Sequence, residues 1–123
     1  MSINCIRTLI EDANVSNPDK IALVFGNEKL TYRELFTKVN QIAYYLAELD
    51  LPKGSRIGLY SNKGIDQVIA ILAILSTNYV LVPLTKLLKA EQVEYIIGDC
   101  DIKCIITDKI KLESIEEIKF DGH

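Results

Sequence analysis

The chain has 123 residues, 49% hydrophobic and 25% charged, and its 14 basic and 17 acidic side chains give a formal net charge of −3. This length fits about one domain that forms a core without disulfides or metal. The mild acidity, with no basic cluster, argues against a nucleic-acid partner, because phosphate binding relies on concentrated Lys and Arg. Three cysteines and a lone histidine, His123, argue against a disulfide framework and a His/Cys metal site, and predict a reducing, cytoplasmic location.

Residues 67–85 are uncharged over 19 positions, which is long enough to span a bilayer. The polar run 76–78 in the middle of this stretch and Pro83 near its end favour a short buried helix, a turn and a buried strand instead. We therefore predict no membrane span. The N-terminal residues contain no apolar run of signal-peptide length, so secretion is not predicted either.

A short helix followed by a small hairpin opens the chain. The helix is predicted by apolar residues at helical spacing, Ile6, Leu9, Ile10 and Ala13. The turn residues 17–19 end it. The apolar run 21–25, the turn 26–28 and the segment 29–31 then predict two antiparallel strands.

Thr31 and Glu34 form the sequence pattern of a capping box, which predicts a helix start. The apolar residues that follow keep to one stripe of a helix of about five turns: Leu35, Val39, Ile42, Ala43, Leu46 and Leu49. Charged and polar residues occupy the other side: Arg33, Lys38, Gln41 and Glu48. We expect the apolar stripe to be buried.

From residue 56 onward, strand and helix patterns alternate. Strands are predicted at 56–60, 79–83 and 103–107, and helices at 67–75 and 90–97. Helical spacing returns over 110–118. This order predicts right-handed parallel crossovers. The predicted fold class is α/β: a partial doubly wound sheet with parallel strands and flanking helices, preceded by a helix and a small hairpin. We treat residues 1–118 as one subdomain and 119–123 as a tail.

No glycine-rich nucleotide loop of the GxGxxG or GxxxxGK[ST] type is present. The segment 61–64, Ser-Asn-Lys-Gly, follows a predicted strand and opens a helix, so it has the position of an anion cradle. One glycine is a weak signal for such a cradle, and the favoured interpretation is a simple cap, in which Ser61 or Asn62 caps the helix and Gly64 eases the turn. Both interpretations stay open at the level of sequence.

No residues of the chain form a recognisable catalytic set. A Ser/His or Cys/His site is excluded because His123 lies in the predicted tail. Cys100 and Cys104 are interpreted as buried structural thiols. Asp99 and Asp101 flank Cys100 and are interpreted as solvated turn residues rather than a carboxylate pair.

Lys86 and Lys89 follow the second predicted strand of the parallel sheet, at the carboxyl edge where ligands bind in open α/β sheets. They are the candidate binding residues of the chain, as contacts for a phosphate group. The alternative is a pair of solvated lysines beside a helix cap.

Several segments in a fixed order resemble the N-terminal region of the adenylate-forming superfamily, the AMP-dependent synthetases and ligases. They are Leu30 to Leu35 (Leu-Thr-Tyr-Arg-Glu-Leu), Asn40, Ala43, 53–57, Ser61-Asn62, 73–75 and Val82-Pro83-Leu84. The resemblance runs from about Arg7 to Asp108. The sequence over 87–93 is more similar to the AMP-forming acyl-CoA ligase branch than to the peptide-synthetase branch.

The resemblance implies that the chain is the N-terminal piece of an AMP-forming acyl-CoA ligase that activates fatty acids, and that it is inactive alone. In that family a carboxylate attacks the α-phosphate of ATP, pyrophosphate leaves, and a thiol such as CoA captures the acyl-adenylate. ATP, Mg²⁺ and CoA would serve the parent enzyme, and none would bind this chain alone. No catalytic residue matches, because the family's phosphate loop, ribose-binding acid, magnesium glutamate and C-terminal lysine lie further along such enzymes.

Two departures from the family pattern carry expectations. Asn78 stands where relatives have glycine, and we expect it to adopt the left-handed conformation at a helix end. The second departure is Thr85-Lys86, where relatives have asparagine-proline or aspartate-proline after Val-Pro-Leu. In the same loop, Leu87 stands where some acyl-CoA ligases have an arginine that meets CoA phosphates, which leaves Lys86 and Lys89 as the substitutes. The expected partners are the remainder of the ligase and, through it, a carboxylic acid and CoA, and the fragment is expected to self-associate. The alternatives are a fragment of an amino-acid adenylation domain and a stand-alone, non-catalytic interaction module.

Overall fold

The computed structural model describes residues 5–116, 118 and 120–123. They form two compact units. The first unit comprises residues up to 50 together with 63–78, and the second comprises 51–62 together with 79–123. That residues 1–118 make one subdomain stays a prediction. Residue 1 lies outside the described residues, and so do residues 117 and 119 at the predicted boundary.

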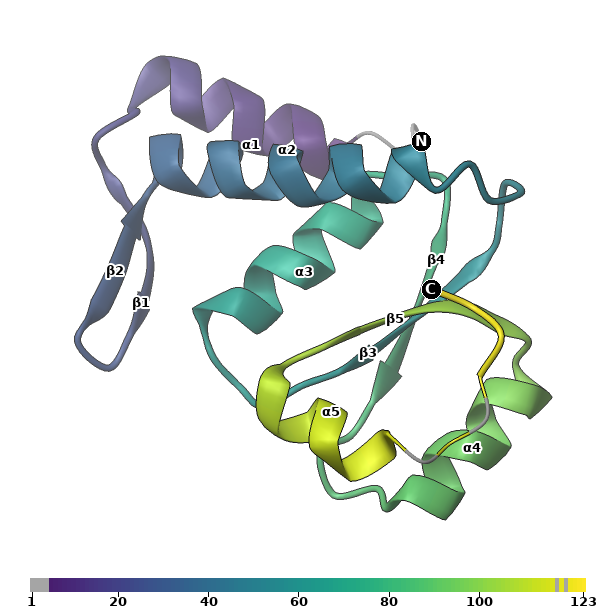
Figure 1. Ribbon diagram of the computed structural model, residues 1–123. Helices are drawn as coiled ribbons and strands as arrows, with labels where there is room; N and C mark the ends of the chain where they lie inside the picture. The colour runs from purple at the N-terminus through teal and green to yellow at the C-terminus, as the bar shows by residue number, and fades with distance from the viewer. Residues whose placement is uncertain (1–4, 117, 119) are drawn as a thin grey trace. The chain divides into compact units, whose positions relative to one another are not determined.

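The first unit contains three helices and a hairpin among its described residues (Figure 1). Its elements are α1 (Cys5–Ser16), β1 (Ile21–Phe25), β2 (Glu28–Thr31), α2 (Tyr32–Glu48) and α3 (Ile65–Leu75). β1 and β2 pair antiparallel, with Phe25 opposite Glu28. Gly26 takes a φ of +59° in the turn between them, a conformation that glycine adopts without strain. The predicted opening helix and hairpin are confirmed.

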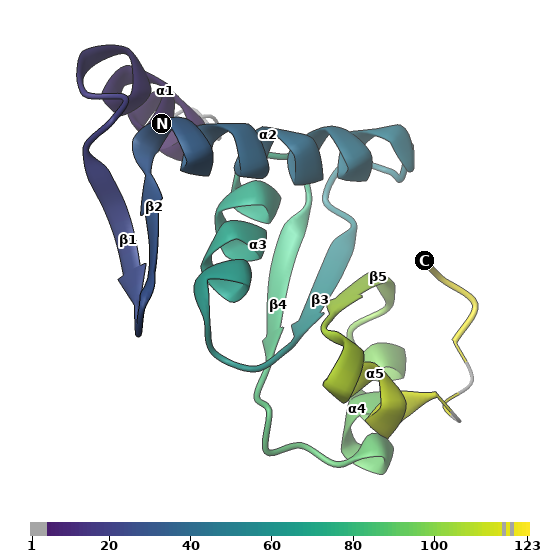
Figure 2. The same cartoon turned by 60° about the vertical axis from the view of Figure 1, so that its left-hand side comes forward.

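The core of the first unit lies between α1, α2, α3 and the hairpin. α1 and α2 lie side by side (Figures 1 and 2). The buried residues are Ile10, Leu30, Leu35, Val39, Ala43, Ile65, Ile69 and Ala73. The predicted buried stripe of α2 is therefore confirmed at four of its positions, which are Leu35, Val39, Ala43 and Leu46. Leu9, in contrast, is 67% exposed, so the apolar stripe predicted for α1 is wrong at this position.

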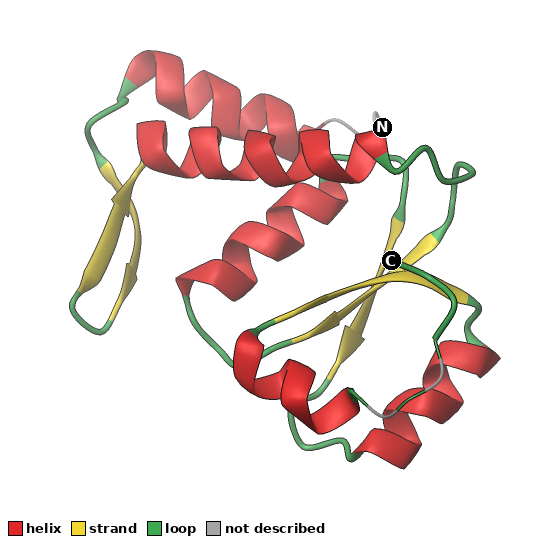
Figure 3. Ribbon diagram, in the orientation of Figure 1, coloured by secondary structure: helices red, strands yellow, loops and turns green. Residues whose placement is uncertain are grey.

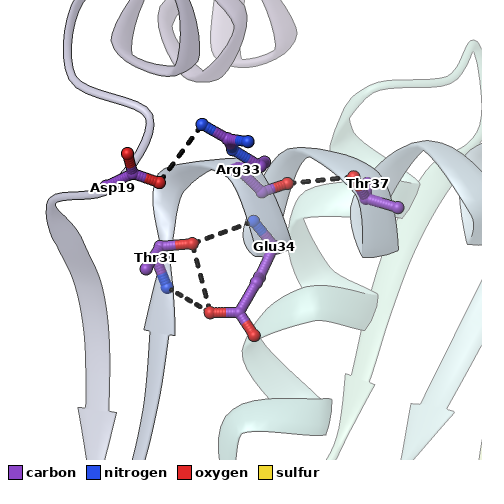
Figure 4. A network of polar contacts seen from close by, with 5 residues as sticks. All are labelled: Asp19, Thr31, Arg33, Glu34 and Thr37. Atoms are coloured by element: carbon purple, nitrogen blue, oxygen red, sulfur yellow. Dashed lines mark hydrogen bonds and ion pairs between the residues drawn. The ribbon is translucent and has the colours of Figure 1, made fainter.

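The start of α2 is fixed by a reciprocal set of hydrogen bonds (Figure 4). The Glu34 backbone N–H donates to Thr31 Oγ1 at 3.2 Å, and the Thr31 backbone N–H donates to Glu34 Oε1 at 3.0 Å. These bonds satisfy two donors that a helix N-terminus leaves without partners. The bond from the Thr31 amide is also the largest cause of the lowered pKa of Glu34. The predicted capping box is confirmed.

Replacing Thr31 with Ala should reduce the free energy of unfolding by about 1 kcal/mol, because the N-cap acceptor is lost. Thr31→Ser is the matched control, since serine keeps the hydroxyl and caps helices equally well. Urea denaturation followed by circular dichroism measures both. Equal stability of the Ala and Ser variants would contradict this role for the hydroxyl.

The second unit is built on a parallel sheet of three strands (Figure 3). Its elements are β3 (Arg56–Tyr60), β4 (Val80–Leu84), α4 (Ala90–Asp99), β5 (Ile102–Thr107) and α5 (Lys109–Ile115). The strand order is β4-β3-β5, so the chain moves to one side of β3 and then crosses to the other. This reversal is the doubly wound pattern, and the predicted α/β class is confirmed.

Pro83 lies on β4, the edge strand of this order, opposite Leu59 of β3. The Val80 backbone N–H donates inward to the Ser55 carbonyl at 2.8 Å. Because backbone groups of a parallel strand alternate between its two sides, Pro83 occupies a position that faces away from β3. Proline removes no ladder bond there, which explains why it is tolerated within the strand.

The core of the second unit lies between one face of the sheet and the helices α4 and α5 (Figure 2). Its buried members are Tyr60, Leu84, Val93, Ile97, Ile102 and Ile115. Gly58 lies beneath two of them: a Cβ added there would be 3.3 Å from both Leu84 Cδ1 and Ile102 Cδ1. The absence of a side chain at Gly58 lets these two residues close over the middle strand.

In the described part of the chain, the residues other than glycine that adopt the left-handed backbone conformation are Asp50 and Asp101, with φ of 51° and 52°. The left-handed conformation expected for Asn78 is therefore wrong. After α3 the chain continues in a tight helical turn instead, since the Thr77 backbone N–H donates to the Ile74 carbonyl at 3.0 Å. Asp is tolerated in the left-handed region because its short side chain bonds locally.

Candidate functional site

The loops that follow β3, β4 and β5 meet at the carboxyl edge of the parallel sheet. In open α/β sheets ligands bind outside this edge, at the point where successive connections leave in opposite directions. Here that point lies between β3 and β5, because β4 and β5 flank β3 on opposite sides. The segments that end there are 61–62 and 107–108, so they define the candidate site.

Asp108 bridges these two segments. Its Oδ2 accepts a hydrogen bond from the Asn62 backbone N–H at 2.7 Å, and its Oδ1 accepts one from the Lys111 backbone N–H at 2.7 Å. The bond from Asn62 is the main cause, and that from Lys111 the second, of a pKa of Asp108 below its ordinary value. The carboxylate therefore occupies the position that an anionic ligand would take at Asn62.

The interpretation of 61–64 as an anion cradle is thus not supported, and the alternative as a side-chain cap is wrong as well. α3 begins after Gly64 with no side-chain cap, and Asn62 uses its backbone N–H to bind Asp108. Gly64 has a φ of 162°, an extended conformation that any residue adopts. Ser61 Oγ is buried and has no hydrogen-bond partner among the described residues.

Lys86 and Lys89 lie on the loop after β4 with exposed side chains. Two donors from other elements hold this loop: Tyr60 Oη donates to the Leu88 carbonyl at 2.6 Å, and Lys111 Nζ donates to the Lys86 carbonyl at 2.6 Å. The Lys111 ammonium also lies 5.3 Å from the centroid of the Tyr60 ring. The loop that carries both lysines is therefore held at Lys86 and at Leu88.

The structure adds Lys111 and Asp108 to the residues that the sequence singled out. Asp108 caps α5 through Lys111, three residues on. An Asp directly after a predicted strand and before helical spacing was the signal that could have found this cap. The bond from Lys111 to the Lys86 carbonyl joins residues 25 positions apart and has no local sequence signal.

The cysteines and acids near α4 have structural surroundings. Cys104 is buried, and burial raises the pKa of its thiol, which keeps the thiol protonated and unreactive. Cys100 is half-buried, so the prediction of buried thiols is confirmed for Cys104 only. Asp101 forms an exposed ion pair with Lys103 at 3.0 Å, which confirms it as a solvated turn residue. Asp99 is exposed as well, but it is the last residue of α4 rather than part of a turn.

In the part of the chain that the structure describes, no three His, Cys, Asp or Glu residues gather in a way that could hold a metal ion. These residues therefore do not fit a magnesium site, and we derive no step through Mg²⁺. None of the described helices has both the length and the apolar character that a bilayer crossing needs.

Replacing Asp108 with Ala should lower the free energy of unfolding by about 2 kcal/mol, the sum of a lost N-cap and a lost charge-assisted hydrogen bond. Asp108→Asn, which keeps an acceptor oxygen without the charge, should cost less. Because the folded pKa lies below the unfolded value, the stabilisation by the charge is present above about pH 4 and is lost as the pH falls through the folded pKa.

Urea denaturation of the chain and of both variants, between about pH 2.5 and about pH 7, measures this effect. This range spans the ordinary pKa of Asp. We expect the gap between the chain and the Asn variant to shrink on acidification. A gap that stays constant or widens toward low pH would contradict the role of the Asp108 carboxylate.

The fold is a doubly wound α/β sheet, and the candidate site lies at its carboxyl edge. Residues 10–122 match the family of AMP-binding enzymes, and the chain belongs to this family. It is 33% identical over 117 residues to tyrocidine synthase 1 of Brevibacillus parabrevis, covering 95% of this chain and 11% of that protein. It is 34% identical over 117 residues to gramicidin S synthase 1 of Brevibacillus brevis, again 95% and 11%.

Solved structures share the fold over most of the chain. An adenylation–carrier di-domain, NpsA-ThdA from Klebsiella oxytoca, superposes with a TM-score of 0.83 at 21% identity, covering 100% of this chain and 23% of that one. The anthranilate CoA ligase AuaEII gives a TM-score of 0.84 at 24% identity, covering 96% and 23%. The chain thus spans about a tenth of the length of these curated relatives and about a quarter of these structures.

Proposed function

We propose that this chain is the N-terminal segment of an enzyme that activates amino acids as adenylates, in the manner of peptide synthetases. The observation that carries the proposal is the similarity to tyrocidine synthase 1 and gramicidin S synthase 1 along 95% of the chain. The prediction of an acyl-CoA ligase depends on the similarity of residues 87–93 alone. Similarity over the whole chain outweighs seven residues, so amino-acid adenylation becomes the leading interpretation.

In this proposal the chain contributes scaffold and no reacting group. Asp108, Asn62 and Lys111 bind one another, and the Cys104 thiol is held protonated. No other described group combines a nucleophile with a base. ATP and Mg²⁺ would bind residues outside this segment, and we expect no turnover from the isolated chain.

A second candidate is an AMP-forming acyl-CoA ligase, favoured by the fold likeness to AuaEII. Lys86 and Lys89 would then contact CoA phosphates, because both ammonium groups are exposed on a loop held by Tyr60 and Lys111. Phosphate is bound well by lysine as a point charge. The activity would be ATP-dependent thioester formation from a fatty acid and CoA.

A substrate screen on the full protein encoded by the gene separates these candidates. Pyrophosphate exchange into ATP is measured with each amino acid and with fatty acids, and acyl-CoA formation is measured with CoA present. We expect exchange with one or a few amino acids and no acyl-CoA. Thioester formation from fatty acids, with no response to amino acids, would overturn the leading proposal in favour of the second.

The remainder of the enzyme would be the partner of this chain, working in the cytoplasm. Large apolar side chains are exposed along the described residues, among them Leu9, Val15, Val24, Leu87 and Ile110. Such residues favour contact with further protein, and without it they favour self-association. Light scattering of the isolated chain should therefore show dimers or larger species, and a clean monomer at high concentration would contradict this.

A further inference from the structure

The loop after β4, residues 85–89, has two carbonyl groups that accept hydrogen bonds from side chains of other elements. We call this segment the β4 loop. Tyr60 Oη, at the end of β3, donates to the Leu88 carbonyl at 2.6 Å. Lys111 Nζ, in α5, donates to the Lys86 carbonyl at 2.6 Å. The conformation of the β4 loop therefore depends on side chains of β3 and α5.

The Lys111 side chain makes a second contact, with the ring of Tyr60. Its ammonium lies 5.3 Å from the ring centroid, within the range of a cation–π attraction. The Tyr60 ring is buried and offers the ammonium a fixed surface. No carboxylate in the described part of the chain forms an ion pair with Lys111. The charge of this lysine is therefore directed at a carbonyl oxygen and an aromatic face.

The backbone of Lys111 belongs to a second set of hydrogen bonds. Its N–H donates to Asp108 Oδ1, and Asp108 Oδ2 accepts from the Asn62 backbone N–H, each at 2.7 Å. Asn62 follows β3 in the chain, and Asp108 follows β5. Asp108 thus joins the loops after β3 and β5, and Lys111 joins both of them to the β4 loop.

We propose that Lys111 is a positioning residue that couples the β4 loop to the loops after β3 and β5. Asp108 holds its backbone, and its side chain holds the β4 loop, so that Lys86 and Lys89 are presented at the carboxyl edge in one arrangement. A hydrogen bond from a charged donor contributes more than one from a neutral donor. This inference rests on the proposed function, because it takes the carboxyl edge as the ligand-binding edge of the enzyme.

Amide hydrogen exchange of the 123-residue chain, followed by NMR, tests the role of the ammonium. The reporter is the Leu88 backbone N–H, which donates to the Thr85 carbonyl at 3.1 Å within the β4 loop. Lys111→Met keeps most of the side-chain length but removes the ammonium. We expect the Leu88 amide to exchange roughly three- to tenfold faster in this variant, the factor that one net hydrogen bond contributes. Lys111→Arg keeps a charged donor and should leave the exchange slow.

A control variant and a reference amide separate this effect from general changes. Lys109→Met removes the same charge from the same helix, at an exposed position, and should leave the Leu88 amide unchanged. Each rate is compared with that of the Val80 amide, which donates to the Ser55 carbonyl and reports a general loss of stability. An unchanged Leu88 amide in Lys111→Met, an equal increase in Lys109→Met, or fast exchange in Lys111→Arg would overturn the proposal.

The coupling to the other loops is tested at Asp108, which forms none of the hydrogen bonds to the β4 loop. Asp108→Ala should also speed the exchange of the Leu88 amide relative to the Val80 amide, because the backbone of Lys111 is then released. In a chain that already carries Lys111→Met, the same substitution should have no further effect on this ratio. Additive effects would overturn the coupling, since Asp108 would then act on the β4 loop without Lys111.

A spectroscopic signature checks the contact with the ring. The ε-methylene protons of Lys111 adjoin an ammonium that lies over the Tyr60 ring, so they should resonate upfield of those of Lys109. Equal chemical shifts for the two lysines would contradict the contact and overturn the proposal. None of these readouts involves pyrophosphate exchange. Failure of the proposed enzymatic activity and failure of the positioning proposal are therefore distinguishable.

Discussion

Replacing Ile10 with Ala should lower the free energy of unfolding by about 3 kcal/mol, whereas replacing its neighbour Leu9 with Ala should change it by less than about 0.5 kcal/mol. Both residues are large and aliphatic, and both belong to the apolar stripe that the sequence predicts for α1. Ile10 is 8% exposed within the core of the first unit, but Leu9 is 67% exposed. Truncation at Ile10 therefore leaves a cavity, and truncation at Leu9 leaves none.

Urea denaturation followed by circular dichroism measures both variants under identical conditions. Similar losses for the two variants would contradict the orientation of α1, and a larger loss for Leu9 would reverse it. An unchanged slope with denaturant would show that the change lies in the stability of the native state and not in the compactness of the unfolded chain.

Replacing Ile102 with Ala should also cost about 3 kcal/mol, and adding Gly58→Ala to this variant should restore part of the loss. In the natural chain a Cβ at Gly58 would lie 3.3 Å from Ile102 Cδ1 and from Leu84 Cδ1, so both side chains would have to move. Once Ile102 is Ala, the added methyl group fills the space instead. The two substitutions should therefore couple by about 1 kcal/mol.

A double-mutant cycle of the single and double variants measures this coupling directly. The sign of the coupling free energy tests the prediction most strictly. Gly58→Ala should be better tolerated in the Ile102→Ala background than in the natural chain. Strict additivity of the two changes would contradict the packing of Ile102 and Leu84 over Gly58.

Most elements of the fold could be predicted because local patterns specify them. The capping box at Thr31 and Glu34 fixes the start of α2, and the alternation of apolar runs with helical spacing fixes the parallel sheet. Boundaries shifted by one or two residues where no cap marks them, as at α3, which begins at Ile65 rather than at 67.

The candidate site was predictable only in position. A parallel sheet places Lys86 and Lys89 at its carboxyl edge, and the sequence shows that much. The bond between Asp108 and Asn62, 46 positions apart, and the one between Lys111 and the Lys86 carbonyl depend on how separate strands come together. Periodicity along one element cannot reveal such contacts, so the occupation of the anion position by Asp108 was missed.

His123 shows the same limit at the end of the chain. Residues 120–123 carry no periodic pattern, and the sequence therefore placed His123 in a loose tail. Its backbone in fact pairs with β5 through Lys103 and Ile105. Backbone pairing needs no particular side chain, which is why the pattern of side chains gave no sign of it.

Reading the gene beyond the codon for His123 tests the central claim, that this chain is one segment of an adenylate-forming enzyme, most directly. The account predicts an open frame that continues into a Ser/Thr/Gly-rich phosphate loop. A stop codon immediately after His123 would contradict it, and would instead favour a small protein that has kept the scaffold without the catalysis.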